Sequence, residues 1–202
     1  MAIAAENPEI GLAGSPPFIR AVAAFLVLAG LGLAAIRFVG ASPAEDGIEG
    51  ALGSLALGAP VMATGALALL AIRERVVLLL PAAVVLVPMS LLSFVTLPLL
   101  VPAAMLSIGY RRRSRIEPMS AARTAVTLWV VVLFLIAAVG ALLVHQDPRE
   151  YSTATSSGGT SDIITAVEAL ISLALTATSL AAGWFLSAPG HGRTVTNAVE
   201  PT

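Results

Sequence analysis

Cysteine and lysine are both absent from this chain of 202 residues, and histidine occurs only twice. Without cysteine the chain forms no disulfide, no iron–sulfur cluster and no thiolate zinc site, and it has no cysteine nucleophile. Charged residues make up only 11% of the sequence, and a net charge of −1 provides no broad basic surface for nucleic acid. These absences exclude several classes of function before any segment is considered.

The sequence contains long apolar runs with very few charged residues. Hydrophobic residues make up 57% of the chain and its mean hydropathy is +0.94, outside the range of soluble globular domains. A helix needs about 20 apolar residues to cross the hydrocarbon core of a bilayer. Runs with scarcely a charge occupy 21–36, 51–72, 76–109, 124–144 and 163–187. The sequence therefore predicts an all-α fold, a polytopic transmembrane helix bundle.

The first apolar run could also be read as a secretory signal, with small residues at 42–44 as a cleavage site. Signal peptides have a positively charged start and a short apolar region. Here the leading segment carries Glu6 and Glu9, and Arg37 interrupts the approach to the site. We therefore expect residues 19–39 to form a retained helix.

The run 76–109 is too long for one crossing. As a single helix it would be about 50 Å long, against a hydrocarbon thickness of about 30 Å. It also contains four prolines, which remove backbone donors and kink or end helices: Pro81, Pro88, Pro98 and Pro102. We expect a hairpin that turns near Pro88, Met89 and Ser90.

The arginines provide an independent test, because arginine in short loops sets the orientation of membrane helices. With two passages in 76–109, nine arginines fall on one side and two on the other, whereas one passage sorts them seven against four. We therefore predict six membrane segments, with the proline-rich hairpin as segments 3 and 4 and with both termini cytoplasmic. A re-entrant first arm, about 76–88, gives the same sorting and stays open as an alternative.

These assignments predict the domain organisation. Residues 1–18 and 188–202 form cytoplasmic tails, and 19–187 form a single transmembrane helical domain. Because all 11 basic residues are arginine and alanine and glycine are abundant, we expect codon bias of a GC-rich bacterial genome. The expected location is a bacterial inner (cell) membrane, where the bilayer itself is the first partner.

The last span carries the most informative polar pattern. When residues advance by about 100° each, five polar residues share an arc of about 80°. This polar stripe consists of Thr165, Glu168, Ser172, Thr176 and Ser179. Lipid cannot satisfy such groups, so we expect the stripe to face the bundle interior or a cavity. Glu168 is either part of a solute or ion pathway, or a residue with a packing and interfacial role near the outer end of its helix.

Small residues mark a second pattern, since membrane helices associate through close packing at such positions. Ser54, Gly58 and Gly65 share one face of the second helix and are expected to contact a neighbouring helix, within this bundle or in an oligomer.

The connection at 110–123 carries five arginines, which we interpret as a topology signal or as a site for anionic lipid headgroups. These are Arg111, Arg112, Arg113, Arg115 and Arg123.

Enzymatic motifs are missing from the sequence. It has no G-x-S-x-G elbow, no H-E-x-x-H helix and no P-loop, and both histidines lie outside the predicted spans. His145, Asp147 and Glu150 match no zinc or calcium spacing. We expect no enzyme activity, no metal and no cofactor.

Two functional interpretations remain. The first is a non-catalytic accessory or scaffold subunit that acts through helix–helix contacts with a membrane-protein partner or with a second copy of the chain. The second is a component for transport or permeation of a small solute or ion that uses the polar stripe.

Overall fold

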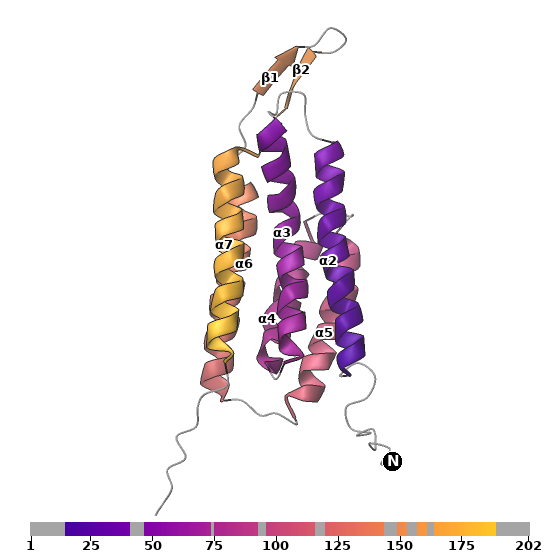
Figure 1. Cartoon of the computed structure of the whole chain (residues 1–202), viewed down its shortest axis with the longest axis vertical. Helices are drawn as coiled ribbons and strands as arrows, with labels where there is room; N and C mark the ends of the chain where they lie inside the picture. The colour runs from indigo at the N-terminus through magenta and orange to yellow at the C-terminus, as the bar shows by residue number, and fades with distance from the viewer. Residues whose placement is uncertain are drawn as a thin grey trace, which may run out of the picture.

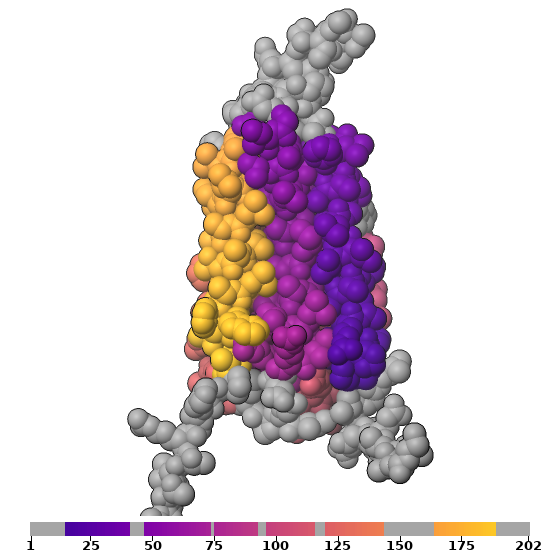
Figure 2. Space-filling view, in the orientation of Figure 1, coloured from indigo at the N-terminus to yellow at the C-terminus, as the bar shows by residue number. Residues whose placement is uncertain are grey.

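The computed structural model describes residues 15–40, 47–73, 75–92, 96–115, 120–143, 149–152, 157–160 and 164–188. Its helices run side by side along one long axis (Figure 1), and α3 lies between α7 and α2 on the face shown in Figure 2. The elements in chain order are α2 (Pro16–Val39), α3 (Gly47–Ala71), η1 (Val76–Leu78), α4 (Leu79–Ser90), η2 (Leu97–Leu99), α5 (Leu100–Arg113), α6 (Ala121–Leu143), β1 (Arg149–Ser152), β2 (Ser157–Thr160) and α7 (Ala166–Leu186).

Four of these helices, α2, α3, α6 and α7, are long and apolar enough to cross a membrane. They match the four long spans that the sequence predicts, with ends shifted by a few residues. Helix α3 is central, because 61% of its most apolar window is buried against 22–33% for the other three. Large side chains such as Leu28, Leu133 and Phe185 point outward, which is typical of a lipid-facing surface.

Helices α2 and α3 pack closely because glycine removes the side chains between them. A Cβ atom on Gly65 would lie 2.8 Å from the carbonyl oxygen of Ala23, and one on Gly58 would overlap that of Gly30. The first apolar run thus forms a long helix that packs closely against α3.

The proline-rich run forms two short helical arms that lie at one end of the bundle (Figure 1). Pro81 and Pro102 each occupy the first turn of their helix, where no intrahelical donor is required. The predicted turn was placed too early, because α4 continues through Pro88 and ends at Ser90. Neither arm reaches the length of the four long helices, and six crossings are not confirmed.

The two ends of the bundle are distinguished by these arms. The hairpin end holds the start of α2, the end of α3, both outer ends of the arms, the start of α6 and the end of α7 (Figure 1). The far end holds the other ends of the four long helices. There β1 and β2 pair antiparallel, with Arg149 opposite Thr160 and Ser152 opposite Ser157.

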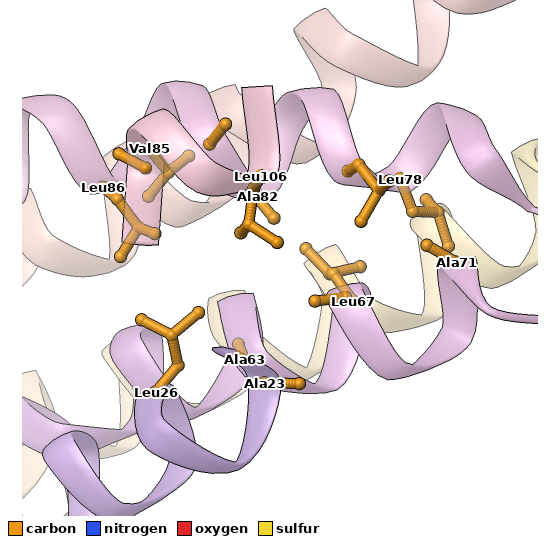
Figure 3. Close-up of a cluster of buried hydrophobic side chains, with 14 of the residues drawn as sticks. Ala23, Leu26, Ala63, Leu67, Ala71, Leu78, Ala82, Val85, Leu86 and Leu106 are labelled. Atoms are coloured by element: carbon orange, nitrogen blue, oxygen red, sulfur yellow. The ribbon is translucent and has the colours of Figure 1, made fainter. Parts of the chain in front are cut away.

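The main core lies toward the hairpin end. Figure 3 shows Ala23 and Leu26 of α2, and Leu67 of α3, facing Leu78 and Leu86 of the first arm. A second, smaller cluster toward the far end consists of Ala56, Leu142, Ile164 and Ala169. Small residues in the main core let the helices approach closely, which is how membrane helices gain packing energy.

Candidate functional site

The polar stripe begins with a capping box at the start of α7. The Thr165 backbone N–H donates to Glu168 Oε2 over 2.8 Å, and the Glu168 N–H donates to Thr165 Oγ1 over 3.4 Å. This reciprocal arrangement satisfies two backbone donors that have no partner within the helix. One carboxylate oxygen of Glu168 therefore holds the far end of α7 in place.

The rest of the stripe lies inside the bundle. Glu168 is only 7% exposed, and Ser172, Thr176 and Ser179 are buried as well. The same face continues to Gly183, where a Cβ atom would lie 3.0 Å from Leu67 and 3.5 Å from Val131. The stripe therefore faces α3 and α6, and it does not reach the lipid-facing surface.

Several hydroxyl groups of the helices, including that of Ser179 in the stripe, bond to their own backbone. Ser54 donates to the Gly50 carbonyl over 2.6 Å, Thr178 to that of Ala174 over 2.8 Å, and Ser179 to that of Thr176 over 2.7 Å. Such bonds satisfy a hydroxyl without any partner from another helix. These hydroxyl groups therefore need no hydrogen-bond partner from a neighbouring helix.

Three atoms of the stripe depart from this pattern. Glu168 Oε1, Ser172 Oγ and Thr176 Oγ1 are buried and have no hydrogen-bond partner. They occupy successive turns of α7, and residues four apart have Cβ atoms about 5–6 Å from each other. That separation fits one bridging water between neighbours, since each hydrogen bond spans about 2.8 Å. The row is therefore a line of buried polar atoms that no group in the described part of the chain satisfies.

Helix α3 also contains a backbone acceptor without its usual helical donor. Pro60 lies inside α3 and has no N–H, so the carbonyl of Ala56 lacks its usual donor. Ala56 is fully buried and belongs to the same cluster as Ala169 and Ile164 of the α7 start.

The other end of α7 is held by two arginines that the sequence pattern did not single out as a pair. Arg75 donates to the Trp184 carbonyl and, over 3.4 Å, to Ser187 Oγ, and its guanidinium lies 3.6 Å from the centroid of the Trp184 ring. Arg123 Nε donates to the Leu186 carbonyl over 3.0 Å. Cations are favourable at a helix C-terminus because the last carbonyls are unpaired.

Of the predicted arginine cluster, Arg123 thus has a structural partner within the bundle. Arg111, Arg112 and Arg115 are exposed and Arg113 is half-buried, all at the hairpin end. Their positions suit both a topology signal and contact with lipid headgroups.

The predicted packing residues lie inside one bundle. Ser54, Gly58 and Gly65 are all buried in α3, and the two glycines face α2.

The residues considered for a metal site are largely outside the described part of the chain: His145 and Asp147 lie there, as does the side chain of Glu150. Within the described part of the chain, no group of three His, Asp or Glu residues is placed to hold a metal ion.

Four helices long and apolar enough to cross a bilayer suggest that this is a membrane protein. No family model, no curated protein and no solved structure matches the chain.

Proposed function

We propose that the chain is a multi-pass, non-catalytic component of a bacterial inner (cell) membrane, an accessory or scaffold subunit that binds a partner through helix–helix contacts. It has six membrane segments, two of them the short arms of the hairpin, and both termini are cytoplasmic. The partner is another membrane protein or a second copy of this chain.

The arginines support this orientation. The far end has Arg37 and the backbone of Arg149, whereas most described arginines stand at the hairpin end: Arg20, Arg73, Arg75, Arg111, Arg112, Arg113, Arg115 and Arg123. Cytoplasmic loops carry the excess of arginine, so the hairpin end is the cytoplasmic end.

The outward face of α7 is the surface through which we expect the chain to bind its partner. Opposite the polar stripe, four small residues are exposed on successive turns: Ala174, Ala177, Thr178 and Ala181. Small residues on a lipid-facing surface let another helix approach its backbone closely. The Thr178 hydroxyl is already bonded to the Ala174 carbonyl, so this face presents no unpaired side-chain donor to lipid or to a partner.

Co-purification in mild detergent tests this role. We expect the wild-type chain to elute with a stoichiometric partner or as a defined oligomer, and the double variant Ala177→Leu, Ala181→Leu to elute alone. Ala137→Leu is the matched control, because Ala137 is exposed on α6. A wild-type chain that elutes as a lone homogeneous monomer contradicts the proposal.

A second function, passage of a small solute or of protons along the stripe, is favoured by the three buried unpartnered atoms of α7. Glu168→Gln tests it cleanly, because glutamine keeps the capping box and removes the charge. Transport into proteoliposomes that depends on Glu168 supports this second function. Identical transport by the wild-type and glutamine forms rejects it.

A further inference from the structure

A cavity of about 350 Å³ lies in the far half of the bundle. Its walls come from four elements, represented by Leu33 of α2, Leu57 of α3, Met89 at the tip of the hairpin and Leu142 of α6. A volume of this size is within the range of about 300–1,000 Å³ for small-molecule sites.

The short hairpin explains why the cavity exists. The first arm, Val76–Ser90, rises about 22 Å at about 1.5 Å per residue, whereas α3 rises about 37 Å. Beyond Leu92 and Thr96, which line the cavity, the long helices continue without the two arms between them. The space that the arms leave is not filled by side chains.

A smaller cavity of about 190 Å³ extends the space between α4 and α6. It shares Met89, Leu92 and Val139 with the larger cavity, and its additional walls include Ile136 and Gly140. A Cβ atom on Gly140 would meet no other atom within 4 Å. The two cavities are therefore adjacent, and their apolar walls together extend from α2 to α6.

Among the residues that the structure describes, one charged side chain lines these cavities, and it stands at the far end. Arg37 belongs to the last turn of α2, near the level where lipid headgroups meet the hydrocarbon. Almost every other lining residue is apolar. An elongated apolar space with a cation at its mouth is complementary to an acyl chain that carries an anionic headgroup.

We propose that this cavity binds one acyl chain of an anionic phospholipid, with the phosphate beside Arg37 and the chain running toward Gly140. In a bilayer the chain gains no hydrophobic energy by entering, because lipid tails are as apolar as leucine. It gains dispersion contacts with cavity walls that come from four elements at once. The proposal is independent of the proposed subunit role, since the cavity is lined by α2, α3, the hairpin and α6 and not by the outward face of α7.

Native mass spectrometry of the full chain in mild detergent tests the proposal, with phosphatidylglycerol as the probe and phosphatidylcholine as the comparison. We expect one phosphatidylglycerol to bind at least about fivefold more tightly, the effect of about 1 kcal/mol for one arginine near anionic headgroups. Equal binding of the two lipids by the wild-type chain overturns the proposal.

Two substitutions test the contacts of the lipid headgroup and of its acyl chain separately. Arg37→Gln should remove the preference for phosphatidylglycerol over phosphatidylcholine. Gly140→Leu should fill the smaller cavity and reduce binding of both lipids about tenfold. Gly32→Leu is the matched control, because Gly32 is exposed on α2, a Cβ atom there meets no other atom, and it lines neither cavity. Binding by Gly140→Leu equal to that of Gly32→Leu overturns the proposal.

A measurement on the wild-type chain avoids any effect of substitutions on folding. A phosphatidylglycerol with a photoreactive group at the end of one acyl chain should crosslink to Val139 and Leu142 of α6, which line the cavity and are not exposed. Crosslinks confined to outward-facing positions such as Leu28 or Leu133 identify annular lipid only and overturn the proposal.

Discussion

The two halves of the bundle are built differently, although both consist of the same kind of apolar helix. The hairpin half contains up to six helical segments side by side and most of the 24 residues of the main core. The far half contains four long helices, a four-residue cluster and the larger cavity. The difference comes from the length of two proline-rich arms and requires no difference in composition. A short hairpin thus creates a tightly packed half and an open half in one bundle.

The two ends of α7 are also stabilised in different ways. At the far end, Thr165 and Glu168 satisfy backbone N–H groups through local contacts within four residues. At the hairpin end, Arg75 and Arg123 reach the last carbonyls from segments more than 60 positions away. Local caps fix only the helix itself, whereas the arginines also fix α7 against the rest of the bundle.

The largest effect should come from core truncation in the tightly packed half. We expect Leu67→Ala to lower the free energy of unfolding by about 3 kcal/mol, because the side chain is fully buried among rigid helices. Leu142→Ala, beside the cavity in the open half, should cost at most about 2 kcal/mol, because fewer contacts are lost there. Thermal unfolding in mild detergent, followed by circular dichroism, measures both. Equal losses would remove the distinction between the halves.

A smaller effect is expected for the arginine that holds α7. Arg75→Met removes two hydrogen bonds and a contact with the Trp184 ring, so it should destabilise the bundle by about 2 kcal/mol. Arg73→Met is the matched control, since Arg73 is an exposed arginine of the same connection. Detergent unfolding curves that coincide for the two variants would contradict the anchoring role.

The smallest effect concerns the local cap at the far end of α7. Glu168→Ala should cost about 1 kcal/mol because it removes the capping box, whereas Glu168→Gln should stay within about 0.5 kcal/mol of the wild type. The same unfolding assay measures these differences. A glutamine variant as unstable as the alanine variant would show that the charge, and not the cap, stabilises this end.

The sequence predicted the four long helices because length and the absence of charge are sufficient to define them. The apolar run 124–144 corresponds to Ala121–Leu143, and the run 163–187 to Ala166–Leu186. A period of 3.6 residues also placed Ser172 and Thr176 on one face of α7, and both are buried. Patterns of this kind depend on local geometry only.

Long-range features were not predictable in the same way. The arginine sorting required an even number of passages in 76–109, but nothing in the sequence fixed how deep the arms reach. The cavity follows from that depth. The pairing of Arg75 with the end of α7 depends on which connection passes beneath which helix, and this is a property of the assembled bundle.

The central claim is that the proline-rich hairpin returns the chain to the side of the membrane on which it began. Single-cysteine labelling tests this claim most directly, because the chain has no cysteine to interfere. Arg73→Cys and Ser114→Cys flank the hairpin, and Gly47→Cys stands at the far end, where a Cβ atom meets no other atom. In intact cells, a membrane-impermeant maleimide should label Gly47→Cys and leave both flanking cysteines unlabelled. Labelling of only one of the two flanking cysteines would place them on opposite sides of the membrane and contradict the returning hairpin.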